Sequence, residues 1–152
     1  TTRRATVDAL LRWELGPAWG LRFDAVVCGE DVAAKKPDPQ AHRLALAALR
    51  LPAGCALAIE DSGAGAAAAR ACGVPVVVAR SAYFADDRVE AALAIGPGFH
   101  ARDGWRPAAR EQDGEVITLD DLARWHARAQ RPGLRAPQAS KALIAGWKVA
   151  GE

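Results

Sequence analysis

Three shortages in the sequence exclude whole classes of protein: cysteines are few, long hydrophobic runs are absent and the net charge is small. Cys28, Cys55 and Cys72 lie in apolar runs without CxxC spacing, so neither a disulfide framework nor a zinc site is expected. We expect reduced, buried thiols, as in a cytoplasmic protein. No apolar stretch approaches the roughly 20 residues that cross a bilayer, and the first residues do not form a signal peptide.

The charge balance gives no reason to expect a nucleic acid or a membrane as partner. The formal net charge is +2, and acidic and basic residues are interspersed through most of the chain. With 152 residues, of which 51% are hydrophobic and 25% charged, the sequence fits one soluble globular domain with one core. The oligomeric state is left open.

Short apolar runs alternate with stretches of helical periodicity along the chain. Runs rich in valine and alanine predict three strands, at residues 24–28, 55–59 and 75–79. Apolar residues spaced three and four apart predict four helices, at residues 7–15, 39–49, 66–71 and 118–129, with a weaker pattern at 89–92. This alternation is typical of βαβ units, so we expect an α/β fold with a parallel sheet.

Residues at the predicted helix ends support these boundaries. Thr6 is a good N-cap for the first helix, and Asp38 can cap the second, with a proline at its first position. Gly73 stands where a helix commonly ends. Thr118, with Asp121 three residues later, forms a variant of the capping box in which Asp replaces Glu or Gln.

Several side chains have an ordinary structural explanation. The second helix carries an apolar stripe that we expect to face the core, made of Ala41, Leu44, Ala45, Ala48 and Leu49. The histidines lack a partner at ligand spacing, and we expect solvated side chains for His42, His100 and His126. Without a basic stripe beside them, packing rather than base stacking is expected for Trp13, Trp19 and Trp105.

Two motifs carry chemistry: Lys35-Lys36-Pro37-Asp38-Pro39 and Ile59-Glu60-Asp61-Ser62-Gly63-Ala64-Gly65. Each follows a predicted strand, and the carboxyl ends of parallel strands meet at the edge of the sheet where ligands bind. Carboxylate oxygens are the ligands that Mg²⁺ prefers, and a lysine can hold phosphate as a point charge. The motifs therefore predict a site for a metal and a phosphate.

Roles follow from the chemistry of each side chain. Asp61 is expected to bind Mg²⁺, with Glu60 as a second ligand or as a support behind it, and Lys36 to contact phosphate oxygens. The small residues from Ser62 to Gly65 would let the backbone approach a ligand with free amide groups. Taken singly, an Asp before a helix is most often a cap and a Glu-Asp pair is most often solvated. The two motifs together, about 25 residues apart, favour a functional site.

The sequence resembles the haloacid dehalogenase superfamily, in the branch that contains β-phosphoglucomutase and CbbY-type sugar phosphatases. The segment from Val27 to Pro39 is similar to the lysine motif of that family, with its KPxP core. Residues 58–65 are similar to its acidic EDSxxG motif, and residues 68–75 to the helix behind it. The resemblance implies a three-layer, Rossmann-like core around a parallel sheet.

The same resemblance implies a mechanism and roles for individual residues. In this family an aspartate attacks the phosphoryl group, the aspartyl-phosphate is then hydrolysed, and Mg²⁺ bridges carboxylates and phosphate. Lys36 would stabilise charge, Asp61 would bind the metal, and Glu60 would be a ligand or its support. Thr1 and Thr2 resemble the end of the family's hydroxyl motif and would bind substrate phosphate.

One element of the family is missing from the sequence. No DxD motif, which supplies the nucleophile and the general acid/base, occurs in the 152 residues. We expect residues 1–129 to be the C-terminal part of such a core, lacking the central first strand and the cap domain, and to be inactive and poorly stable alone. Residues 130–152 turn to Pro, Gly, Ser and basic residues, and are expected to be a disordered or foreign tail.

The leading hypothesis is a Mg²⁺-dependent phosphatase that acts on a phosphomonoester, a small phosphorylated metabolite such as a sugar phosphate. Two alternatives stay open. A sugar phosphomutase of the same family differs mainly in cap residues and in how water is excluded. A non-catalytic module that binds a phosphorylated ligand or a partner chain would also carry these motifs, and a DxD strand encoded upstream in the same frame would argue against it.

Overall fold

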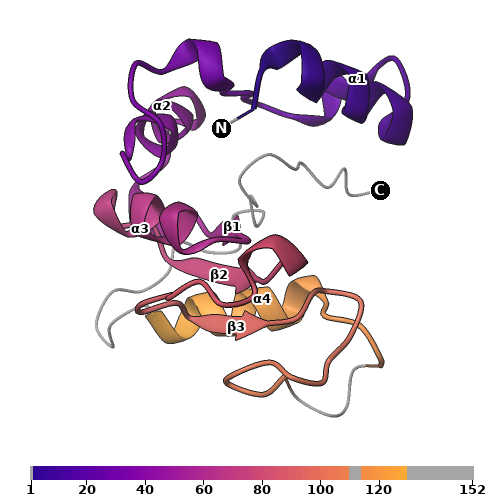
Figure 1. Cartoon of the computed structure of the whole chain (residues 1–152), viewed down its shortest axis with the longest axis vertical. Helices are drawn as coiled ribbons and strands as arrows, with labels where there is room; N and C mark the ends of the chain where they lie inside the picture. Colours follow the sequence, from indigo (N-terminus) through magenta and orange to yellow (C-terminus); the bar gives the residue numbers. More distant parts are fainter. Residues whose placement is uncertain (1, 110–113, 130–152) are drawn as a thin grey trace.

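The computed structural model describes residues 2–109 and 114–129 (Figure 1). Its helices are α1 (Arg4–Leu15), α2 (Gln40–Leu49), α3 (Gly63–Ala71) and α4 (Leu119–Ala129). Its strands are β1 (Ala58–Glu60), β2 (Val76–Ala79) and β3 (Ala94–Gly96). Short 3-10 turns lie between them, at Trp19–Arg22, Gly29–Asp31, Ala53–Cys55 and Ala82–Phe84. No helix in these described ranges is long and apolar enough to span a bilayer.

The strands form one parallel sheet in the order β1-β2-β3. Ile59 is opposite Val77 in the β1–β2 pair, and Val78 is opposite Ile95 in the β2–β3 pair. A parallel pair needs a crossover connection, and α3 supplies it between β1 and β2. The predicted α/β class and parallel sheet are confirmed.

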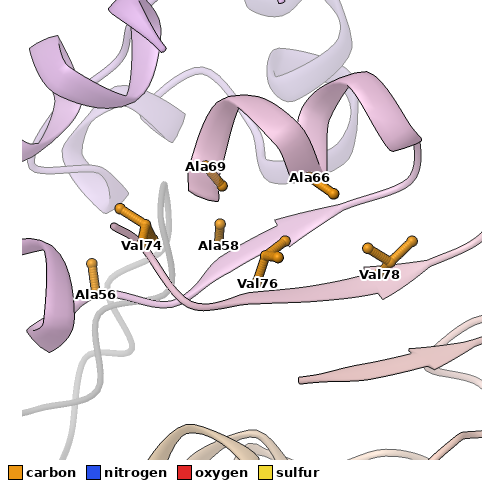
Figure 2. Packing of buried hydrophobic residues seen from close by; sticks show 7 residues of the cluster. All are labelled: Ala56, Ala58, Ala66, Ala69, Val74, Val76 and Val78. Atoms are coloured by element: carbon orange, nitrogen blue, oxygen red, sulfur yellow. The ribbon is translucent and has the colours of Figure 1, made fainter. Parts of the chain in front are cut away.

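Two apolar clusters, one on each face of the sheet, make the core three layers deep. Because side chains alternate along a strand, Val76 and Val78 face α3 while Val77 faces α4. Figure 2 shows Ala66 and Ala69 of α3 directed toward the strands below them. The α3 face also contains Ala56, Ala58 and Val74, and the α4 face contains Leu57, Ala94, Trp105, Ile117, Leu122 and Trp125.

Stacked aromatic rings fill the α4 face. The rings of Trp105 and Trp125 are 4.9 Å apart between centroids, and Phe99 stacks on Trp105 at 5.5 Å. The Trp105 indole lies against Gly96, where a Cβ atom would overlap the ring, so only glycine fits at this end of β3. The Trp105 Nε1 donates to the carbonyl groups of Gly98, at 3.1 Å, and Ala101, at 3.0 Å. Packing is confirmed for Trp105 but not for Trp13, whose surface is 85% exposed.

A buried carboxylate, that of Asp121, lies in the first turn of α4. The backbone N–H of Thr118 donates to Asp121 at 2.9 Å, and the N–H of Asp121 donates to the Thr118 hydroxyl at 3.4 Å, which confirms the predicted capping box. The Asp121 side chain, 1% exposed, also pairs with Arg102 at 2.6 Å and Arg124 at 2.7 Å. Burial raises the pKa of Asp121, but hydrogen bonds from Thr118 and Arg124 outweigh it, and the net pKa is lowered.

Three predictions about elements and cysteines are wrong, and one strand was missed. Residues 24–28 form no strand in the described part of the chain, since no neighbouring strand pairs with them. Residues 89–92 form no helix, and the short strand β3 that follows them was not predicted. Cys28 is buried as expected, but Cys55 is exposed, because it ends a 3-10 turn instead of beginning β1.

The N-cap residues of two helices also differ from the prediction. The first helix begins at Arg4, so Thr6 lies inside its first turn and Arg3 is the N-cap. The second begins at Gln40 with Pro39 as N-cap, and the Asp38 carboxylate accepts from the Gln40 N–H at 2.8 Å. Asp38 thus satisfies a terminal amide, one position earlier than a cap residue would. Gly73, with a φ of 74°, follows the end of α3 as predicted.

Of the five residues in the apolar stripe predicted on α2, three face a hollow instead of a packed core, and the other two, Leu44 and Ala48, are exposed. Ala41, Ala45 and Leu49 line a cavity of about 310 Å³, together with α1 and residues 23–27. Leu46, outside the predicted stripe, packs against the cluster on the α3 face. Figure 1 shows α1 and α2 together at one end of the molecule, with β3 and α4 at the other. The hollow therefore lies where the helical end meets β1, since Glu60 also lines it.

Replacing Asp121 with Asn should lower the free energy of unfolding by about 3 kcal/mol, because it breaks a buried ion pair and leaves Arg102 beside a neutral amide. Urea unfolding, monitored by tryptophan fluorescence, measures this change in the free energy of unfolding. The matched control is Asp120→Asn, an exposed acid in the same helical turn, which should change stability by less than about 0.5 kcal/mol.

This difference depends on pH with a defined sign. The lowered pKa of Asp121 means that its stabilising contribution is present at neutral pH and is lost as the pH falls through that pKa. The gap between wild type and Asp121→Asn should therefore shrink below about pH 4. Equal stability of the Asp121 and Asp120 variants at neutral pH would contradict the structural role of this carboxylate.

Candidate functional site

The carboxyl end of β1 places two acidic residues in different environments. Glu60 is the last residue of β1 and Asp61 the first after it. Consecutive side chains of an extended backbone point in opposite directions. The Glu60 side chain is 8% exposed, while Asp61 is exposed to solvent. One carboxylate is thus turned into the protein and the other toward solvent.

Lys36 reaches Glu60 from the loop that precedes α2. Its Nζ lies 2.7 Å from both carboxylate oxygens, so the ammonium bridges them. The side chain of Lys36 is 29% exposed, so part of it remains accessible to solvent. The structure therefore joins the two sequence motifs through an ion pair between residues 24 positions apart.

His42 is a third member of this cluster that sequence reasoning missed. Its Nε2 lies 3.3 Å from the Glu60 Oε1, and its side chain is only 13% exposed. The prediction of a solvated side chain is wrong, because the first turn of α2 turns His42 toward β1. Its place one helical turn after the KPDP segment was the signal available in the sequence. His100 is exposed as predicted, while His126 contacts the Gly54 carbonyl at 2.8 Å.

The electrostatics of Glu60 follow from these partners. Burial raises the pKa of Glu60, but hydrogen bonds from His42 and Lys36 and the lysine charge outweigh that cost, and the net pKa is lowered. Glu60 is therefore ionised at neutral pH and forms a partly buried ion pair with Lys36.

Gly65 makes room for the Glu60 carboxylate. A Cβ atom built at Gly65 would overlap the carboxylate of Glu60, so the acid lies directly against the first turn of α3. Ser62 is the N-cap of that helix, and its hydroxyl accepts a hydrogen bond from the Gly65 N–H at 3.2 Å. The N–H of Gly63 donates to the Asp87 carboxylate at 2.8 Å. The expectation of free amide groups is thus wrong for Gly63 and Gly65.

Of the two predicted hydroxyl residues the structure describes Thr2, and no hydrogen bond among the described residues joins Thr2 to this cluster. Thr1 lies outside the described residues. The backbone carbonyl of Thr2 accepts from the Gly29 N–H at 2.8 Å, which ties the start of the chain to the segment before α2. Phosphate binding by Thr1 and Thr2 stays a prediction.

The donor set fits Mg²⁺ through Asp61 rather than Glu60. Both oxygens of Glu60 are held by Lys36, whereas no hydrogen bond or ion pair engages the Asp61 carboxylate within the described residues. Among those residues no group of three or more His, Cys, Asp or Glu side chains could enclose a metal. Mg²⁺ often binds through one or two protein carboxylates and keeps several waters, so a single exposed carboxylate is compatible with it.

The class of protein follows from fold, motifs and comparison together. A family model for haloacid dehalogenase-like hydrolases matches residues 1–73, which include Lys36, Glu60 and Asp61. Over these residues the chain is similar to the haloacid dehalogenase-like hydrolases.

CbbY proteins are among the relatives that the chain matches. The plasmid CbbY of Cupriavidus necator is 42% identical over 129 residues, covering 83% of this chain and 50% of the relative. The crystal structure of CbbY from Rhodobacter sphaeroides in complex with phosphate has a TM-score of 0.56 and 35% identity, over 60% of this chain and 41% of its own. A CbbY variant from the same organism, in complex with xylulose-(1,5)bisphosphate, matches equally well. This chain thus spans half or less of the length of these relatives.

The close approach of Gly65 and Glu60 can be tested with Gly65→Ala. Alanine in a helix normally adds up to about 1 kcal/mol of stability. Here overlap with the carboxylate should dominate and lower stability by about 1–3 kcal/mol in thermal unfolding. The control is Gly20→Ala, where an added Cβ meets nothing within 4 Å. A Gly65→Ala protein as stable as this control would contradict the tight packing of Glu60.

Proposed function

We propose that this chain supplies the phosphate-holding lysine and the metal-binding carboxylate of a Mg²⁺-dependent phosphatase. The observation that carries the proposal is the cluster at the end of β1. There Lys36 is held by Glu60 at 2.7 Å, and Asp61, the residue that follows Glu60 in the chain, is exposed. A fixed cation and a neighbouring free carboxylate suit a phosphoryl group and its counter-ion.

Lys36 contacts substrate phosphate in this proposal. An ammonium has three N–H donors, and the two oxygens of Glu60 accept at most two of them in the arrangement observed. The third can donate to a phosphoryl oxygen and stabilise the negative charge that develops during transfer. Glu60 keeps Lys36 in place and thereby lowers the cost of orienting a long, flexible side chain.

Asp61 holds the metal, with water and substrate oxygens completing its coordination. When bound, Mg²⁺ would offset the charge of the phosphate and of the attacking carboxylate. Glu60, already paired with Lys36, is a support for the site in this proposal rather than a direct ligand. The 152 residues contain no DxD, so in this proposal the aspartate that forms the aspartyl-phosphate is supplied from outside them.

A sugar phosphate is the substrate class we favour. Two solved CbbY relatives contain phosphate and xylulose-(1,5)bisphosphate, which are ligands of those proteins. The partner of this chain would then be a small phosphorylated metabolite in the cytoplasm. Release of inorganic phosphate from a panel of sugar phosphates, with and without Mg²⁺, tests the function directly. Failure to hydrolyse any phosphomonoester in the polypeptide that includes the attacking aspartate would refute it.

Lys36→Ala in that polypeptide should reduce kcat by about 10²–10³-fold, the range for loss of one fixed charge-stabilising donor. The matched control is Lys35→Ala, because Lys35 is the adjacent lysine and is exposed. Its turnover should stay near wild type. Steady-state phosphate release measures both variants, and an unchanged kcat for Lys36→Ala would remove Lys36 from the mechanism.

Asp61→Asn should weaken Mg²⁺ binding at least about tenfold, since it removes the charged ligand while keeping the shape of the side chain. Calorimetric titration with MgCl₂ measures Mg²⁺ affinity in the absence of turnover. The Mg²⁺ dependence of phosphate release measures Mg²⁺ affinity during catalysis. Asp86→Asn, at an exposed acid elsewhere, serves as the control. Equal Mg²⁺ affinity in the two variants would show that Asp61 is not the ligand.

A further inference from the structure

The Glu60 carboxylate is contacted by two side chains from the same short stretch of chain. Lys36 bridges both oxygens at 2.7 Å, and the imidazole of His42 reaches Oε1 at 3.3 Å. The third neighbour is the backbone of Gly65, against which the acid packs. Glu60 therefore has contacts on several sides, and His42 is one of the two polar side chains that limit its rotation.

The lack of a partner for the Nδ1 atom of His42 indicates why the contact of its Nε2 atom with Glu60 matters. Its Nδ1 is buried without a hydrogen-bond partner among the described residues. An unsatisfied buried nitrogen destabilises a protein, and an apolar ring of similar size would avoid that cost. The contact between Nε2 and Glu60 is the polar interaction that can offset it. With the proton on Nε2, the ring donates to the carboxylate, and Nδ1 is left as the buried acceptor.

We propose that His42 is a positioning residue, which fixes the Glu60 carboxylate so that Lys36 stays in the orientation needed at the phosphate site. The inference rests on the role of Lys36 in the proposed function. Lys36 and His42 lie on either side of the start of α2, so their shared contact with Glu60 fixes this helix end to β1 at two points. A two-point contact restricts rotation more than the lysine pair alone.

The experiment compares the chemical reactivity of two adjacent lysines. Trace acetylation with acetic anhydride labels an amine only while it is free of its partner, and mass spectrometry after cleavage at glutamate isolates residues 31–60. That peptide contains only the lysines Lys35 and Lys36, so the exposed Lys35 is an internal reference. The measured quantity is the ratio of Lys36 to Lys35 labelling in the purified protein, which needs no turnover.

His42→Phe should raise this ratio about twofold to tenfold, the range for loss of one hydrogen bond. His42→Gln keeps an N–H donor at nearly the same distance from the backbone and should return the ratio toward wild type. His42→Ala repeats the comparison if the phenylalanine variant does not fold. His100→Phe, at an exposed histidine, should leave the ratio unchanged. Recovery with Gln is the result that a merely space-filling role would not give.

The inference is overturned if the ratio in a folded variant without a donor equals or falls below wild type, or if Gln behaves like Phe. In an active polypeptide, His42→Phe should also lower kcat several-fold more than it raises KM, because Lys36 acts on the developing charge. An unchanged kcat in the Lys36→Ala variant would instead refute the role of Lys36 in the proposed function. The labelling ratio would still decide whether His42 positions the lysine, so the two failures are distinguishable.

Discussion

The buried carboxylate of Glu60 is the constraint around which the candidate site is arranged. An acid that is 8% exposed is costly unless it is paired, and Lys36 supplies the charge that makes it tolerable. The pairing has three structural requirements: a lysine in the loop before α2, a donor on the first turn of that helix, and a glycine in α3 where a side chain would collide. Each is met, by Lys36, His42 and Gly65. The motifs are therefore spaced as they are because one carboxylate needs partners from both.

Two neighbouring acids on one strand end would repel a third negative group if both were free. Here the ion pair with Lys36 neutralises Glu60 inside the protein, while Asp61 keeps its charge at the surface. The alternation of side chains along an extended backbone separates these two environments within a single residue step. The edge of the sheet thus offers one uncommitted carboxylate and part of one ammonium, a balance that favours a divalent cation together with a phosphate rather than either alone.

Local patterns were enough to predict the β1–α3–β2 unit, the capping box at Thr118 and that the two motifs meet, as Lys36 and Glu60 do. Each depends on contacts within one or two successive elements. Residues 24–28 read as a strand because they are apolar and β-branched, but a strand also needs a neighbour to pair with, which a single segment cannot reveal. The opposite error occurred at β3, whose three residues are too short to show alternation. The prediction of a solvated His42 was wrong because helical periodicity shows only which face of a helix a residue lies on. What that face packs against depends on a tertiary contact, here with Glu60.

The hollow beside α2 explains why polar contacts have so much influence on this site. Ala41, Ala45 and Leu49 line a cavity instead of interlocking with β1, so this face of the helix gains little positional restraint from close packing. Leu46 holds the helix against the α3 face, and the Cys72 thiol donates to the Pro39 carbonyl at 3.3 Å. Within the described residues, Lys36 and His42 reach β1 from either side of the start of α2 through Glu60. Hydrogen bonds are directional where apolar contacts are not, so a cluster of three polar side chains can orient the lysine although the helix beside it borders a cavity.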